Sequence, residues 1–171
     1  MINFQNYSSI TKLTFPGNIN LVNNNFSNMF YSMDNINIVN INHNNIIDLS
    51  YAYYNCRNLV GNISCGPQVK NMTYAYFNCR NLVGSPICGN NVINMAYTYY
   101  YCRNLIGNPV CGNNVTDMTN TYYYCNNLTG SPVCGDKVTN MYGTYSSCWN
   151  LIGNPVCGNN VTDMYSTYAG C

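Results

Sequence analysis

Residues 115–128 read Val-Thr-Asp-Met-Thr-Asn-Thr-Tyr-Tyr-Tyr-Cys-Asn-Asn-Leu, and residues 138–151 read Val-Thr-Asn-Met-Tyr-Gly-Thr-Tyr-Ser-Ser-Cys-Trp-Asn-Leu. The two stretches follow one another with a 23-residue period, and after one further residue each continues as Gly-x-Pro-Val-Cys-Gly. A unit this short cannot bury its apolar face alone, so a fixed period indicates units that stack on their neighbours. The sequence therefore predicts a repeat solenoid built from 23-residue repeats.

The same period extends over nearly the whole chain. One 23-residue step toward the N terminus leads from Tyr53 to Phe30, and a second leads to Tyr7, so that apolar residues replace one another. Such columns are expected to face the core, because volume and hydrophobicity matter there more than identity. The predicted core residues are Tyr53, Tyr76, Tyr99, Tyr122 and Tyr145; Leu59, Leu82, Leu105, Leu128 and Leu151; and Cys56, Cys79, Cys102, Cys125 and Cys148.

Length and periodicity together favour one solenoid domain over residues 1–171. We expect divergent N-terminal repeats in residues 1–45 and regular 23-residue repeats in residues 46–171, with no evident C-terminal cap. Within a repeat, Met118, Tyr122, Cys125 and Leu128 follow helical spacing over a stretch too short for an independent helix. The spacing predicts a short helical or 3₁₀ turn, and the Pro-Val-Cys run between two glycines predicts a short parallel β-strand.

Charge and hydropathy exclude several partners. Only 6% of the residues are charged and the net charge is +1, whereas a protein that binds nucleic acid is normally clearly basic. No apolar run approaches the ~20 residues of a membrane span. We therefore expect neither nucleic acid nor a membrane span among the partners of this chain.

The eleven cysteines form two columns, one from Cys56 to Cys171 and the other from Cys65 to Cys157. Closely spaced pairs are missing and His43 is the one histidine, so no metal site and no cofactor are predicted. Two interpretations stay open: buried thiols that act as small apolar residues, or one disulfide per coil. Because the number of cysteines is odd, the second interpretation leaves one thiol over.

The repeated motif resembles a known family. Residues 115–128 and 138–151 are similar to the V-T-N-M-x-x-M-F-x-x-C-x-x-L repeats of BspA-like leucine-rich repeat surface proteins, although Leu-x-Gly-x-Pro-Val-Cys-Gly replaces the family's L-x-x-L-x-L strand. The resemblance implies a leucine-rich-repeat-like right-handed coil and a non-enzymatic adhesion module. It also implies an extracellular, cell-surface or virion location. The first residues lack the features of a signal peptide, which leaves a cytoplasmic location open.

Aromatic and basic columns supply the candidate ligand-binding residues. Adjacent residues on a turn point in different directions, so the ring beside each core tyrosine is expected at the surface. Exposed rings and a ladder of arginines would suit a glycan, a protein or an acidic ligand. The alternatives are rings packed between coils and a solvated row of arginines. The candidates are Tyr54, Phe77, Tyr100, Tyr123, Arg57, Arg80 and Arg103.

Catalysis finds no support in the sequence. General acid–base chemistry needs a unique convergent pair of groups, whereas repetition spreads equivalent side chains along a stack. No catalytic residue is predicted. Three functions are compatible with the pattern: adhesion or receptor binding through the tyrosine and arginine columns, self-association of solenoid ends into filaments, and an intracellular interaction scaffold.

Overall fold

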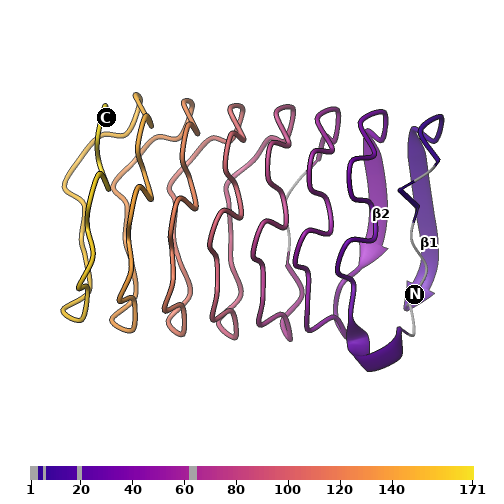
Figure 1. The fold of residues 1–171 in the computed structure, drawn as a ribbon, viewed down its shortest axis with the longest axis horizontal. Coiled ribbons are helices and arrows are strands. Elements are labelled where there is room, and N and C mark those ends of the chain that lie inside the picture. The colour runs from indigo at the N-terminus through magenta and orange to yellow at the C-terminus, as the bar shows by residue number, and fades with distance from the viewer. Residues whose placement is uncertain (1–3, 6, 19–20, 62–64) are drawn as a thin grey trace.

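The protein winds into successive coils that lie side by side along its long axis, with the N terminus at one end and the C terminus at the other (Figure 1). The computed structural model describes residues 4–5, 7–18, 21–61 and 65–171. Two strands and one short helix occur in these ranges, all near the N terminus: β1 (Lys12–Asn18), the 3₁₀ helix η1 (Val22–Asn24) and β2 (Ile38–Asn42). The rest of the described chain is built from turns and isolated bridges.

The two strands are parallel and belong to neighbouring coils. Lys12 pairs with Ile38, which is a longer step along the chain than one regular repeat, and the register shifts between Thr14 and Asn18. In the regular repeats single parallel bridges replace strands, and the partners follow the 23-residue period except for the bridge between Gly84 and Leu105. One ladder of bridges joins Asn25, Asp48, Asn71, Asn94, Asp117, Asn140 and Asp163, and another joins Ile87, Val110, Val133 and Val156.

The predicted strand at Pro-Val-Cys is thus reduced to one bridging residue per coil. The proline before Val133 has no N–H to give to a ladder. Its counterpart in the preceding coil, Pro109, instead accepts a hydrogen bond from the Val133 N–H at 3.4 Å. Backbone pairing between coils is therefore brief on this side of the coil.

The predicted helical turn is a run of overlapping reverse turns. The N–H groups of Ala52 and Cys56 donate within the coil, to the carbonyls of Leu49 and Tyr53, at 3.0 and 3.1 Å. The N–H groups of Tyr51 and Tyr53 donate instead to carbonyls of the next coil, at 3.0 and 2.8 Å. Donors alternate in this way because every second peptide faces the neighbouring coil, so the segment satisfies its backbone without forming a helix.

Several of these turns hold a bulky residue in the left-handed region. The φ angles of Tyr51, Tyr74 and Tyr97 lie between 56° and 57°, and those of Tyr101 and Tyr124 are 61° and 59°. Turns of this kind ordinarily take glycine or asparagine at that position, since a side chain there costs about 1–2 kcal/mol. Stacking between coils and the ladder of hydrogen bonds must hold these tyrosines in place.

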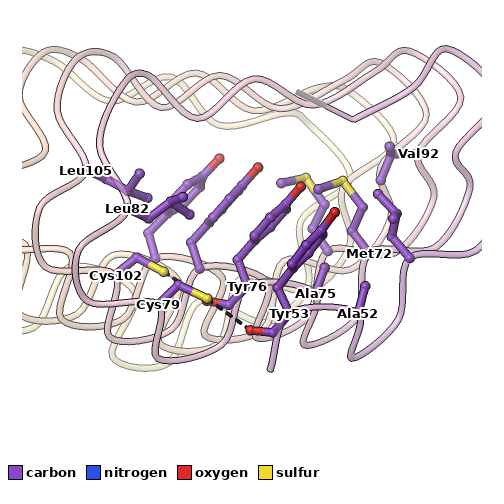
Figure 2. Packing of buried hydrophobic residues seen from close by; sticks show 14 of the residues in the cluster. Ala52, Tyr53, Met72, Ala75, Tyr76, Cys79, Leu82, Val92, Cys102 and Leu105 are labelled. Atoms are coloured by element: carbon purple, nitrogen blue, oxygen red, sulfur yellow. Dashed lines mark hydrogen bonds between the residues drawn. The ribbon is translucent and has the colours of Figure 1, made fainter. Parts of the chain in front are cut away.

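The core runs along the axis as stacked columns of equivalent residues (Figure 2). The predicted tyrosine, leucine and cysteine columns are buried, except that Leu151 in the last coil is half-buried. The rings of Tyr53, Tyr76 and Tyr99 lie almost parallel, with centroids 5.1 and 5.6 Å apart. Continued by Tyr122, Tyr145 and Tyr168, this core tyrosine stack extends over six coils.

The first coil departs from the predicted register. Phe30 continues the core tyrosine stack at 5.3 Å from Tyr53, as its spacing predicts. The ring that stacks on Phe30 from the other side is Phe4, at 5.6 Å, whereas Tyr7 is 57% exposed. The step from Phe4 to Phe30 equals the step from Lys12 to Ile38 between β1 and β2. The prediction for Tyr7 is therefore wrong, because the first coil is longer than a regular repeat.

Throughout the described chain the eleven cysteines are thiols. In the first column each Sγ donates to a backbone carbonyl of the preceding coil at 3.0 Å, as Cys102 does to Tyr76. In the second column the sulfurs of Cys65, Cys88 and Cys111 accept from a glycine N–H of the next coil, for example from the Gly112 N–H to Cys88 at 2.9 Å. Cys134 differs, because its Sγ donates to the Val156 carbonyl at 3.3 Å. Burial raises the pKa of the Cys56 thiol to about 12. The two columns therefore join one coil to the next through hydrogen bonds in which the cysteine sulfur donates or accepts.

Candidate binding surface

A row of stacked aromatic rings lies on the outside of the turn segments. We define the outer row as Tyr31, Tyr54, Phe77, Tyr100 and Tyr123, which includes four of the predicted ligand-binding residues. Neighbouring centroids are 4.7 or 4.8 Å apart and the planes diverge by at most 7°. Each ring is half-buried, because one face of the end rings and both faces of the inner rings touch a ring of an adjacent coil while the edge is open.

A second row, which we call the flanking row, runs beside it and consists of Tyr51, Tyr74 and Tyr97. Its centroids are 4.8 and 4.5 Å apart. The two rows meet at a tilt, as between Tyr97 and Tyr100, whose centroids are 5.8 Å apart at 43°. The flanking row follows the 23-residue spacing of the sequence. The pairs Tyr101–Tyr124 and Tyr142–Tyr165 follow the same period, although they were not predicted.

Stacking determines what these rows can offer a ligand. A ring whose two faces are covered by neighbouring rings presents only its edge and hydroxyl, so along most of the outer row no ligand can stack on a face. The pKa of Tyr100 is raised to about 12, mainly because burial removes water from the hydroxyl and secondly because Tyr123 lies beside it. The hydroxyl is therefore neutral at physiological pH and can both donate and accept a hydrogen bond.

A hollow of about 440 Å³ opens where both rows end. The flanking row stops at Tyr97 because the next coil carries Asn120, and the outer row stops at Tyr123 because the next coil carries Ser146. The hollow is lined by Tyr97, Tyr100, Asn120, Tyr123, Tyr142, Gly143, Ser146 and Ser166. No residue of this lining is charged.

The three arginines of the predicted ladder each contact a different local partner. Arg57 forms an ion pair with Asp34 at 3.3 Å, with both side chains about half exposed. The Nε of Arg80 donates to the Asn78 side chain at 2.8 Å. The guanidinium of Arg103 lies 5.1 Å from the ring centroid of Tyr101. Each arginine thus has a local partner, and none of the three lines the hollow.

Acidic side chains serve the turns. The Asp117 carboxylate accepts hydrogen bonds from the Thr119 N–H at 2.9 Å and the Thr119 hydroxyl at 2.7 Å. Asp48 and Asp163 each accept from the N–H two residues later. Among the described residues, no three His, Cys, Asp or Glu side chains are grouped as metal ligands would be. In these three turns the carboxylates therefore act as acceptors for the backbone.

Two exposed apolar columns were not predicted. One contains Val60, Val83, Ile106 and Ile152, with exposed fractions between 43% and 68%, and the other contains Ile87, Val110, Val133 and Val156, between 39% and 61%. Both columns follow the 23-residue period of the sequence. Periodicity alone does not separate a buried apolar column from an exposed one, so only the structure places them at the surface.

Comparison with known proteins finds no similar family model, curated protein or solved structure. The resemblance to BspA-like repeats therefore rests on the quoted motif alone. In the part of the chain that the structure describes, no helix is long and apolar enough to cross a membrane.

Proposed function

We propose that this chain is a leucine-rich-repeat-like solenoid and a non-enzymatic binding module. In this proposal it binds a glycan or protein ligand, as an adhesion segment of a cell surface or virion. The outer and flanking rows form the ligand-binding surface. The proposal is supported by the repeated motif and by the two aromatic rows.

The observation that carries the proposal is backbone strain at half-buried surface rings. Tyr97 and Tyr101 adopt positive φ angles, while equivalent positions in other coils hold Asn120 and Ser147. Asparagine or glycine tolerates this conformation at lower cost, so folding alone does not favour a tyrosine there. Strained residues that folding does not require are concentrated at functional sites. The rings therefore have a role beyond stability, and binding is the role that half-buried tyrosines at the surface fit best.

The direct test is a binding screen with a variant that removes three of the five rings of the outer row. Wild-type protein is applied to a glycan array and to a panel of immobilised extracellular-matrix proteins. The variant carries Tyr54→Ser, Tyr100→Ser and Tyr123→Ser, because serine already occupies the equivalent position 146. We expect about tenfold or greater loss of binding. Thr139→Ala with Thr162→Ala, on another column, is the control and should bind normally. Equal binding by the triple variant and wild type would refute the proposal.

A second candidate is self-association, favoured by the two exposed apolar columns. Ile87 is 61% exposed and Ile106 is 53% exposed, and pairing with another copy of the chain would bury this apolar surface. An apolar face that docks on a different face of another copy generates filaments. Light scattering and electron microscopy of the purified chain test this. Concentration-dependent growth that Ile106→Lys abolishes would support it, and a monomer at high concentration would exclude it.

A further inference from the structure

We propose that the hollow at the ends of the two rows is a sugar subsite that holds one pyranose ring of a neutral glycan. This inference rests on the proposed binding function and makes it specific. The hollow lies where Asn120 and Ser146 interrupt the two regular rows of rings.

The first argument is the availability of ring faces. A pyranose binds aromatic side chains through the C–H groups on one face of the sugar, which needs an uncovered ring face. The inner rings of the two rows are covered on both sides by rings of their own row; they are Tyr54, Phe77 and Tyr100 in the outer row and Tyr74 in the flanking row. Tyr97 and Tyr123 are the last rings of their rows, and Asn120 and Ser146 follow them in the next coil. Their faces toward the hollow are therefore not covered by another ring of the same row.

The second argument is the chemistry of the remaining lining. Asn120 supplies an amide, and Ser146 and Ser166 supply hydroxyls. The Ser146 hydroxyl already donates to the Ala169 carbonyl at 3.2 Å, which leaves its oxygen able to accept a second hydrogen bond. Sugar hydroxyls can satisfy such groups, whereas an apolar side chain in the hollow would leave them unpaired at a cost of about 1–3 kcal/mol. The lining therefore favours a sugar over an apolar peptide.

The third argument is charge and size. No charged side chain lines the hollow, so a sialic or uronic acid would lose hydration without gaining an ion pair. The volume of about 440 Å³ lies at the lower end of the range for small-ligand sites. The lining also includes Tyr142, which is 41% exposed and stacked on Tyr165 at 5.5 Å and adds a further aromatic ring. The hollow thus matches one neutral ring, with the rest of a glycan outside.

Two substitutions can fill the hollow with a side chain that already occupies the equivalent position of a preceding coil. Ser146→Tyr adds the next ring of the outer row, because position 146 is equivalent to that of Tyr123 in the preceding coil. Asn120→Tyr adds the next ring of the flanking row. Asn120 has a φ of 50°, and Tyr97 adopts 57° at the equivalent position. The matched control is Asn78→Tyr, which adds a ring beside Tyr101 outside the hollow.

The experiment is a titration of the full chain with neutral methyl pyranosides: galactoside, glucoside, mannoside and N-acetylglucosaminide. Saturation-transfer NMR and tyrosine fluorescence report binding, and near-ultraviolet circular dichroism confirms that each variant is folded. We expect one or more pyranosides to bind wild type and Asn78→Tyr with dissociation constants of about 0.1–10 mM. Ser146→Tyr and Asn120→Tyr should each weaken binding at least about tenfold.

The outcomes separate this inference from the broader proposal. Equal binding by wild type and both closed variants would place the sugar elsewhere and overturn the subsite, while the binding function would stand. If no pyranoside binds wild type, the subsite is also overturned, and the array and matrix-protein screen then decides the binding function independently. Preference for a charged sugar over the neutral panel would refute the neutral-ligand assignment.

Discussion

Three core tyrosines bury a hydroxyl that has no hydrogen-bond partner within the described chain: Tyr99, Tyr122 and Tyr145. Each side chain is completely buried, and burial raises each pKa well above its ordinary value. Tyr53, at the N-terminal end of the same stack, differs because its hydroxyl lies 3.1 Å from His43 Nε2. The same residue type therefore contributes differently along one column.

This difference predicts opposite effects of the same substitution. Tyr122→Phe removes an unsatisfied buried hydroxyl and should raise the free energy of unfolding by about 1 kcal/mol. Tyr53→Phe breaks a hydrogen bond and should lower it by a similar amount. Urea denaturation of the two variants beside wild type measures both changes. A loss of stability in Tyr122→Phe would show that its hydroxyl has a partner in solution.

The buried thiols predict a stability that falls at alkaline pH. Burial raises the pKa of Cys56 and Cys88 from the ordinary 9.0 to about 12. The folded state thus keeps protons that the unfolded state loses above pH 9, so the stabilisation is complete below pH 9 and is lost as pH rises toward 12. Each such thiol contributes a slope of about 1.4 kcal/mol per pH unit.

Urea midpoints measured between pH 7 and 11 check this expectation. They should be nearly constant up to pH 8.5 and then decrease. The midpoints of Cys56→Ala should decrease less steeply with pH, because its folded state retains one thiol proton fewer than the wild type. Midpoints that are the same at pH 7.5 and 10.5 would contradict the burial of these thiols.

At the scale of structural elements, the close approach of coils depends on small residues in the Gly-x-x turns. A Cβ on Gly112 would lie 2.6 Å from the backbone carbonyl oxygen of Gly89 in the preceding coil. A Cβ on Gly89 would meet the Cys65 sulfur and the Gly66 oxygen at 3.4 Å, which is an ordinary contact. Equivalent glycines in adjacent coils therefore differ in how much space surrounds them.

This contrast predicts unequal effects of two identical substitutions. Gly112→Ala must push the coils apart and should destabilise the protein by about 2–3 kcal/mol. Gly89→Ala should change stability by less than about 1 kcal/mol. Thermal and urea unfolding of both variants provide the measurement, and equal destabilisation would indicate that coil spacing adapts to an added methyl group.

The whole molecule is a one-dimensional stack in which each coil contacts its neighbours, so its length should be adjustable in whole coils. Asn94 and Asp117 are bridging partners at the same position of consecutive coils. Deletion of residues 94–116 joins Ile93 directly to Asp117 and preserves every column. A deletion of half that length would turn core residues outward.

We therefore expect the 23-residue deletion to fold with lower stability and unchanged near-ultraviolet circular dichroism per tyrosine. Deletion of residues 94–105 is the matched control and should abolish cooperative unfolding. Failure of the 23-residue deletion to fold would show that the coils are not interchangeable.

The sequence by itself determined the period and the identity of the core columns, because buried residues must recur wherever the same face turns inward. The positions of Tyr99, Leu105 and Cys102 followed from spacing alone. It also indicated that the rings beside the core tyrosines form surface rows.

Only the tertiary structure decided the rest, since it depends on contacts between coils. Local preference disfavours Tyr97 at positive φ, and inter-coil hydrogen bonds and ring stacking hold it there. The longer first coil places Phe4, rather than Tyr7, against Phe30. The hollow exists because Asn120 and Ser146 lie beside Tyr97 and Tyr123 in space, although a full coil separates them along the chain. A side chain too small to continue a row creates a site only where its neighbour's ring is left uncovered.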